Sequence, residues 1–243
     1  MALPIIETPT YELTLPSADV KVKYRPFLVK EEKVLLMASE TGNQKEMIQA
    51  IKDIVGACTF NKINASTLPI FDLEYLFLQI RAKSVGEISK FKMLCPDDKE
   101  TYVETEIDLS KVEVQVDDEH NNTIQINDKI KMVMKYPTID TFDPTIDASK
   151  LKTEQLFDII ANTVYEIYEG ETVHKANDYS KEEMKNFIES LTSDHFAKIQ
   201  KFFNTMPRLQ HELEIENPKT KVKSKVVLSG LQSFFVSPSH TTT

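Results

Sequence analysis

Phe71-Asp-Leu-Glu-Tyr-Leu-Phe-Leu-Gln-Ile-Arg-Ala-Lys83, followed beyond Gly86 by Ser89-Lys-Phe-Lys-Met-Leu-Cys95, decides the fold class. The first segment is apolar on nearly every side of a helix, which predicts either a central core helix or a helix partly covered by a partner. We expect the chain's own sheet and carboxyl-terminal helices to cover it. The second segment alternates polar and apolar residues, which is typical of a half-buried strand. The sequence therefore changes from helix to strand at Gly86.

The strand pattern continues from Gly86 to Pro137. It recurs in residues 102–109, 112–116, 123–126 and 129–136, and Asp, Asn and Pro mark the turns between them. These segments predict one antiparallel sheet that projects as a distinct layer from a helical body. Residues 137–150 are expected to form a connector.

The remaining sequence predicts helices with a hairpin near each end of the chain. Residues 11–25 alternate around a turn, and so do the residues on either side of Asn217-Pro218. Helices are expected over residues 30–39, 44–58, 153–169 and 180–204, with a stop and restart at Thr41-Gly42-Asn43 and a candidate break at Thr192-Ser193. Thr153 is a candidate amino-terminal cap, and Ser180 and Glu183 have the spacing of a capping box.

The order of these elements predicts the α+β class rather than alternating βαβ units. We expect a helical main body of residues 1–86 and 137–243, with an amino-terminal and a carboxyl-terminal hairpin. Residues 87–136 are expected to form an antiparallel β insertion.

Composition excludes several classes of function. The 243 residues carry 29 Lys+Arg and 38 Asp+Glu, for a formal charge of −9, which argues against nucleic acid as a partner. No apolar run is long enough for a membrane span, and the amino terminus lacks the pattern of a signal peptide. Two cysteines, Cys58 and Cys95, favour a reducing compartment over a disulfide scaffold.

Motifs for catalysis, cofactors or metals are not found in the sequence. The five glycines form no phosphate-binding loop, and the histidines are scattered. Cys95-Pro-Asp-Asp98 resembles half of a zinc knuckle but is more simply a turn, and Cys58 is expected to be a core thiol. Asp140, Asp143 and Asp147 lack the spacing of a calcium loop. We therefore expect no catalytic residues, no metal and no cofactor.

A family resemblance is carried mainly by Leu15-Pro-Ser-Ala-Asp-Val-Lys-Val-Lys-Tyr-Arg-Pro-Phe-Leu-Val-Lys-Glu-Glu-Lys-Val-Leu-Leu-Met-Ala38. This stretch resembles the amino-terminal signature of the T-even-type (T4-like) phage baseplate hub assembly family, whose hallmark is Arg-Pro-Phe, here Arg25-Pro26-Phe27. The resemblance continues through residues 68–86 and the closing Gly230-Leu-Gln-Ser-Phe-Phe235. It covers nearly the whole chain.

The resemblance implies a non-enzymatic late protein of a contractile-tailed phage, made in the bacterial cytoplasm. It acts either as an assembly factor or as an incorporated subunit of the baseplate hub in the virion tail. Its implied partners are other baseplate or hub proteins, and the resemblance is also compatible with a homo-oligomer. Two alternatives remain: a dedicated chaperone of a hub protein that is absent from the virion, and a small hydrolase with dispersed active-site residues.

Two aromatic motifs are candidate partner contacts. Arg25, Pro26 and Phe27 form the first, although the same residues could instead be structural: Pro26 would fix the strand exit and Arg25 would bond Glu31 or Glu32 across the turn. Phe234 and Phe235 form the second, and they are either core residues or an exposed docking pair.

Overall fold

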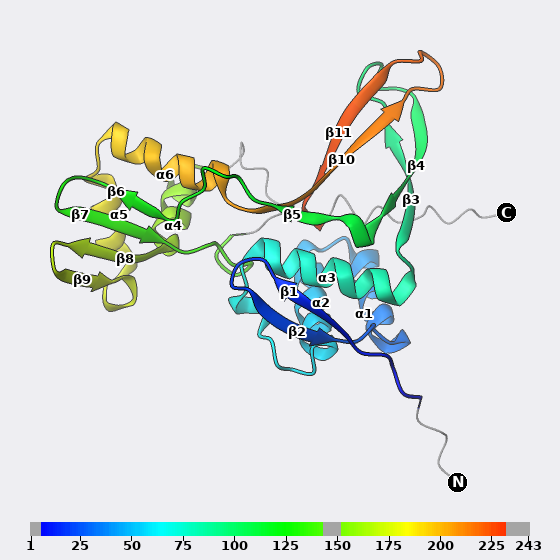
Figure 1. Cartoon of the computed structure of the whole chain (residues 1–243), viewed down its shortest axis with the longest axis horizontal. Helices are drawn as coiled ribbons and strands as arrows, with labels where there is room; N and C mark the ends of the chain where they lie inside the picture. The colour runs from blue at the N-terminus through cyan, green and yellow to red at the C-terminus, as the bar shows by residue number, and fades with distance from the viewer. Residues whose placement is uncertain (1–5, 143–151, 232–243) are drawn as a thin grey trace, which may run out of the picture. The chain divides into compact units, whose positions relative to one another are not determined.

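A computed structural model describes residues 6–142 and 152–231 (Figure 1). The chain divides into two compact units. Unit 1 takes its described residues from Met1–Gln115 and Arg208–Thr243, and unit 2 from Val116–Pro207. These boundaries differ from the expected main body and insertion, because the strands between Gly86 and Pro137 are shared between the two units.

Unit 1 begins with a hairpin and three helices. Strands β1 (Tyr11–Leu15) and β2 (Val20–Tyr24) pair antiparallel, which confirms the amino-terminal hairpin. The helices are α1 (Val29–Thr41), α2 (Gln44–Cys58) and α3 (Ile70–Val85). The first two are separated as predicted: Gly42 adopts a φ of 62°, which favours glycine, and the Asn43 side chain accepts a hydrogen bond from the Lys45 N–H.

Helix α3 is the core of unit 1. Leu73, Leu76, Phe77, Leu78 and Ile80 are completely buried. Strands of this chain cover the second side of the helix, as expected, whereas the carboxyl-terminal helices that were expected to share in the cover belong to unit 2. Leu78 and Ala82 pack against a cluster of strand and turn residues: Phe91, Ile107, Leu109, Val112, Leu209 and Leu228.

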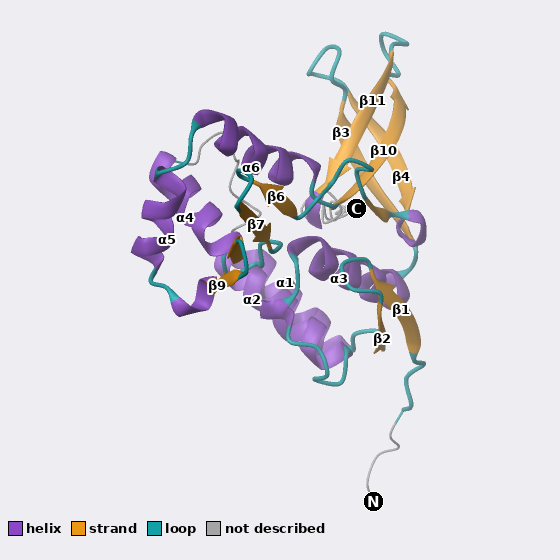
Figure 2. Cartoon of the chain, turned by 60° about the vertical axis from the view of Figure 1, so that its left-hand side comes forward, coloured by secondary structure: helices purple, strands orange, loops and turns teal. Residues whose placement is uncertain are grey.

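Two further hairpins complete unit 1, and Figure 2 shows them lying against each other. Strands β3 (Ile88–Leu94) and β4 (Tyr102–Asp108) form one of them. The other, β10 (Arg208–Glu216) with β11 (Lys223–Ser229), confirms the predicted carboxyl-terminal hairpin. Strand β5 (Glu113–Gln115) extends it to the order β11-β10-β5. Each hairpin carries Lys–Glu pairs across its strands, such as Lys92–Glu104 and Lys225–Glu212.

The described residues of unit 2 form a four-stranded antiparallel sheet and three α-helices. The strand order is β6 (Thr123–Gln125), β7 (Ile130–Met134), β8 (Val164–Glu169) and β9 (Thr172–Lys175). The helices are α4 (Thr153–Thr163), α5 (Lys181–Glu189) and α6 (Ser193–Thr205). Sheet and helices share one core, which includes Met132, Val164, Ile188 and Phe202.

The α+β class is confirmed, but the prediction of a single sheet between Gly86 and Pro137 is wrong. Its strands belong to three sheets. Strand β5 pairs with β10, and β7 pairs with β8. Alternation in the sequence identified β5 and β7, but the partner of β5 and one of the two partners of β7 come from later in the chain.

The helix expected over residues 153–169 ends at Thr163, and the rest is strand β8. Val164-Tyr-Glu-Ile-Tyr168 is rich in β-branched and aromatic residues, which favour a strand. Thr153 is not the cap of this helix: Lys152 is, and its N–H donates to Gln155 Oε1 at 3.0 Å. The candidate break at Thr192-Ser193 is confirmed.

The capping box of α5 is also confirmed, because the Ser180 N–H donates to Glu183 Oε2 at 2.8 Å. The described residues include three short 3-10 helices, at Ala65–Thr67, Leu109–Lys111 and Ala176–Asp178. Among the described residues, no helix has the length and hydropathy that crossing a membrane requires.

Candidate functional site

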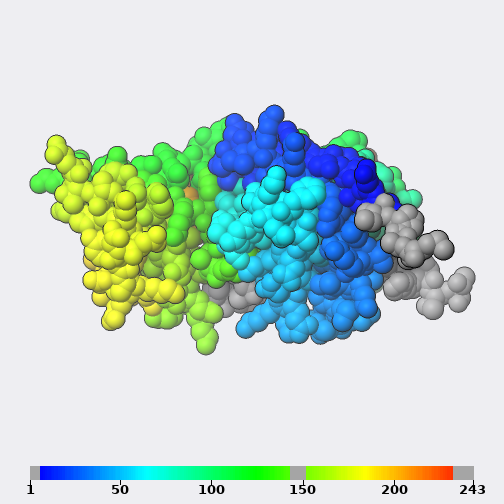
Figure 3. Space-filling view, turned by 90° about the horizontal axis from the view of Figure 1, so that it is seen from below, coloured from blue at the N-terminus to red at the C-terminus, as the bar shows by residue number. Residues whose placement is uncertain are grey.

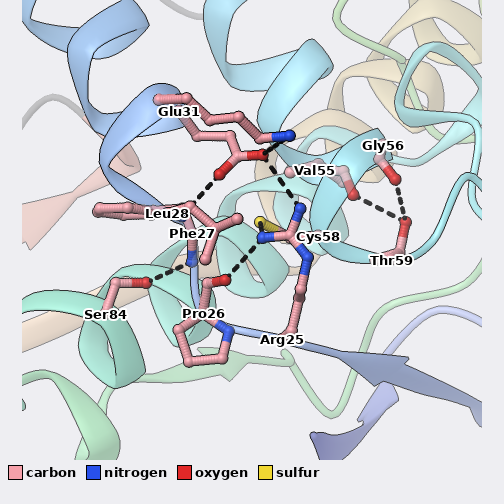
Figure 4. Close-up of polar contacts among 11 residues, drawn as sticks. Arg25, Pro26, Phe27, Leu28, Glu31, Val55, Gly56, Cys58, Thr59 and Ser84 are labelled. Atoms are coloured by element: carbon pink, nitrogen blue, oxygen red, sulfur yellow. Dashed lines mark hydrogen bonds and ion pairs between the residues drawn. The ribbon is translucent and has the colours of Figure 1, made fainter. Parts of the chain in front are cut away.

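The Arg25-Pro26-Phe27 motif lies where β2 leads into α1, and Figure 4 shows its contacts. The Arg25 N–H donates to the Cys58 carbonyl at 3.0 Å, which joins β2 to the end of α2. The guanidinium donates from Nη1 to the Pro26 carbonyl at 2.8 Å and from Nη2 to Glu31 Oε1 at 3.0 Å. The sequence-based interpretation that Arg25 bonds Glu31 across the turn is confirmed.

The same motif holds the beginning of α1. Glu31 Oε2 accepts from the Leu28 N–H at 2.6 Å, so this carboxylate caps the helix that it belongs to. The Phe27 N–H donates to Ser84 Oγ at 2.9 Å near the end of α3. Through these bonds the motif fixes β2, α1, α2 and α3 to one another.

The ion pair at the centre of the motif is nearly buried. The side chains of Arg25 and Glu31 are only 12% and 8% exposed. Burial alone would raise the pKa of Glu31, but the hydrogen bonds from Arg25 and the Leu28 N–H outweigh it and lower the pKa. Glu31 is therefore a buried, ionised and fully engaged carboxylate.

Cys58 lies beside this pair, with its Sγ 3.7 Å from Arg25 Nη1. Burial raises the pKa of the thiol to about 11, although the Arg25 charge opposes the shift. The thiol is thus protonated at neutral pH, and the thiolate is the nucleophilic form. The expectation of a core thiol is confirmed, since Cys58 is fully buried and makes no disulfide.

Helix α1, which the motif holds at its start, exposes apolar side chains. Val29 is 81% exposed, and Leu36 and Met37 are each 56% exposed. The buried residues of this helix are Glu31 and Ala38. We call Val29, Lys33, Leu36, Met37 and Glu40 the outer face of α1. Figure 3 shows α1 and α2, in shades of blue, at the surface of unit 1.

Comparison with known proteins identifies the family. The model of the T4 bacteriophage base plate protein family matches residues 8–236, which include the Arg25 motif and parts of both units. The chain belongs to this family. No curated protein and no solved structure matches it.

The family is a structural family of the phage baseplate. The remaining predicted site residues lie in other parts of this baseplate protein. Phe234 and Phe235 lie outside the described residues, as do Asp143 and Asp147. The turn at Cys95–Asp98 is confirmed: the Asp98 carboxylate accepts from the N–H groups of Glu100 and Thr101 at 3.1 and 3.0 Å. These bonds and one from the Thr101 hydroxyl hold the pKa of Asp98 well below its usual range.

Metal ligands do not gather in the part of the baseplate protein that the structure describes, where no three His, Cys, Asp or Glu side chains meet. His120 bonds instead to the Thr205 hydroxyl and the Tyr136 hydroxyl, each at 3.0 Å. An open hollow of about 400 Å³ in unit 1 is lined by Gln49, Lys52, Asp53 and residues of the following loop. One of about 340 Å³ in unit 2 is lined by Lys135, Asn162, Tyr179 and neighbouring residues.

Two buried carboxylates of α3 were not predicted as site residues. Asp72 accepts from the N–H and the hydroxyl of Ser17. Glu74 accepts from the Leu231 N–H at 3.2 Å, and burial raises its pKa to about 7. The signal in the sequence was the occurrence of acids within an otherwise apolar helix.

Proposed function

We propose that this protein is a non-enzymatic protein of the baseplate hub, acting as an assembly factor or as an incorporated structural subunit of the contractile tail. The observation that carries the proposal is the family match over residues 8–236, which spans most of both units rather than a single motif. The chemistry of the Arg25 motif supports it. The charged side chains of Arg25 and Glu31 pair with each other, and the thiol of Cys58 beside them is protonated at neutral pH.

In this proposal the Arg25 motif contributes to hub assembly by holding helix α1 in place. Arg25 is turned inward to Glu31, while Pro26 and Phe27 are half-buried at the start of α1. Partner contact by Pro26 and Phe27 is part of the proposal, and so is contact by Phe234 and Phe235. The proposal also includes a role for the ion pair between Arg25 and Glu31: it holds α1 so that the outer face of this helix stays accessible to other proteins.

The partners in this proposal are other baseplate or hub proteins. The protein meets them in the cytoplasm of the host bacterium during assembly, and as a subunit it remains in the virion tail. The alternative of a dedicated chaperone uses the same surfaces but leaves before the tail is finished.

The proposal is tested by infection with a phage that lacks this chain. We expect hub and baseplate formation to fail and to be restored by the wild-type chain supplied in trans. Mass spectrometry of purified tails then separates the two modes: a subunit is present in stoichiometric amount, and a chaperone is absent from tails but present on hub intermediates. Normal baseplates without the chain would contradict both.

A second arm tests the aromatic pair. Phe234→Ser with Phe235→Ser is expected to weaken rescue, whereas Thr241→Ala in the same segment is expected to leave it unchanged. Equal rescue by both variants would remove the aromatic pair from the proposal.

A further inference from the structure

The outer face of α1 has a composition that suits a binding surface. At about 100° per residue, Val29, Lys33, Leu36, Met37 and Glu40 fall within an arc of about 100° on one side of the helix. All five are exposed, and the three apolar members are each more than half exposed. Apolar residues grouped on one exposed face, with charges beside them, are typical of a protein-binding site.

The two charges on this face are Lys33 and Glu40, and both side chains are exposed to solvent. Among the described residues, neither Lys33 nor Glu40 takes part in an ion pair. Glu40 lies in the last turn of α1, which contains no basic residue. A negative charge at the carboxyl end of a helix opposes the helix dipole, so a cation beside Glu40 would stabilise α1.

We propose that the outer face of α1 binds the same face of a second copy of this chain, with the two helices antiparallel. A two-fold axis between Leu36 and Met37 places each Lys33 opposite the Glu40 of the other copy, because both lie equally far from that axis. The interface is then isologous, with Leu36 and Met37 at its centre and two ion pairs beside them. A parallel pair would set Lys33 against Lys33 and Glu40 against Glu40. The charges therefore select the antiparallel arrangement.

The size of the face sets the expected strength. Helix α1 has 13 residues and is about 20 Å long. A contact along one such helix buries less than the roughly 1,200 Å² at which stable complexes begin, so the dimer is weak and depends on concentration. This inference concerns the isolated protein and does not rest on the proposed hub function.

The first test is the oligomeric state of the full-length protein. Sedimentation equilibrium from about 5 to about 500 µM is expected to show a monomer that becomes a dimer, as a weak interface requires. Leu36→Glu should raise the dissociation constant by roughly tenfold or more, because two carboxylates meet at the centre of the contact. Val222→Glu is the matched control: this valine is 45% exposed in the turn between β10 and β11, and its replacement should leave dimerisation unchanged.

The second test is a charge exchange between the copies. Lys33→Glu and Glu40→Lys should each weaken the homodimer, since each puts like charges opposite one another. An equimolar mixture of the two variants should form a heterodimer, because every pair across the contact is then opposite in sign. The double variant Lys33→Glu/Glu40→Lys should dimerise like the wild type. Far-UV circular dichroism checks that all variants remain folded.

Three results would overturn the proposal. The first is a wild-type protein that stays monomeric over the whole concentration range. The outer face of α1 would then bind the chain's own carboxyl-terminal residues or another baseplate protein instead. The second is a dimer that Leu36→Glu does not weaken relative to Val222→Glu. The third is a mixture of the two charge variants that stays monomeric while the wild type dimerises.

Discussion

Replacing Glu31 with alanine tests whether the Arg25 motif holds unit 1 together. Removing one partner of a buried ion pair costs roughly 3–5 kcal/mol in the free energy of unfolding. Here the cost is reduced because the Arg25 side chain is 12% exposed and keeps its bond to the Pro26 carbonyl. It is increased because the Leu28 N–H loses its acceptor. We therefore expect Glu31→Ala to destabilise unit 1 by about 2–4 kcal/mol.

Companion variants separate the ion pair from the rest of the effect. Glu31→Gln keeps an acceptor for the Leu28 N–H and should cost less, about 1–2 kcal/mol. Lys30→Ala is the matched control, because Lys30 lies 3.6 Å from the same carboxylate but is 73% exposed. It should cost less than about 1 kcal/mol. In a double-mutant cycle, Arg25→Ala and Glu31→Ala should be coupled by about 1–3 kcal/mol.

The pH dependence gives an independent check on Glu31. Its pKa in the folded protein is lower than the ordinary value of 4.5. Its stabilising contribution is therefore fully present above pH 4.5 and is lost as the pH falls through the folded pKa. The Glu31→Ala variant should approach the wild type in stability at acid pH.

Urea unfolding followed by circular dichroism measures these free energies. Hydrogen exchange in peptides of β2 and α1 shows whether the loss of stability lies in unit 1. This assignment is needed because the two units need not unfold together. The reasoning is refuted if Glu31→Ala costs no more than Lys30→Ala. It is also refuted if the costs of Arg25→Ala and Glu31→Ala simply add.

Three other changes have defined outcomes. Because burial raises the pKa of Glu74 from 4.5 to about 7, ionisation of Glu74 should lower the stability of the protein progressively as the pH rises between those values. In urea titrations at several pH values, Glu74→Gln should flatten this fall and be up to about 3 kcal/mol more stable than the wild type at pH 8. Glu100→Gln, at an exposed position, is the control and should do neither. Leu78→Ala should cost about 2–5 kcal/mol in thermal or urea unfolding, and a change below 1 kcal/mol would contradict the self-covered core. Ser180→Ala should cost about 1 kcal/mol and speed amide exchange at the start of α5, where the Glu183 N–H would lose its acceptor.

The sequence predicted most strands of this fold and both terminal hairpins, but it missed the pairing of β5 and β7 with later strands. Alternation in residues 112–116 and 129–136 located β5 and β7 correctly. Strand β10, which pairs with β5, and strand β8, which pairs with β7 on the side away from β6, lie further along the chain. These pairings depend on contacts that a local pattern does not contain. The expected single sheet followed from the assumption that neighbouring strands pair with one another.

Strand β8 shows a second limit of local patterns. Ile160, Val164 and Ile167 are spaced as on one face of a helix, while Val164 to Tyr168 also suits a strand. The segment is a strand because it pairs with β7 on one side and with β9 on the other. The local sequence supports both structures, and only the tertiary context selects one.

The buried polar contacts were the least predictable part of the candidate site. Arg25 and Glu31 are six residues apart and across a turn, so their pairing could be anticipated. Glu74 meets the backbone of Leu231, which is 157 residues away. Sequence reasoning could only note an acid in an apolar helix, because the donor that satisfies it is brought in by the complete fold.

Helix α1 departs from the usual arrangement of a surface helix at Glu31, which is buried beside Arg25. Such a helix normally buries its apolar side chains and exposes its charges. Helix α1 buries Glu31 together with Ala38 and exposes Val29, Leu36 and Met37. A buried carboxylate is tolerated only with a partner, which Arg25 provides. The motif thus anchors α1 through a polar contact, while Val29, Leu36 and Met37 on its outer face stay exposed.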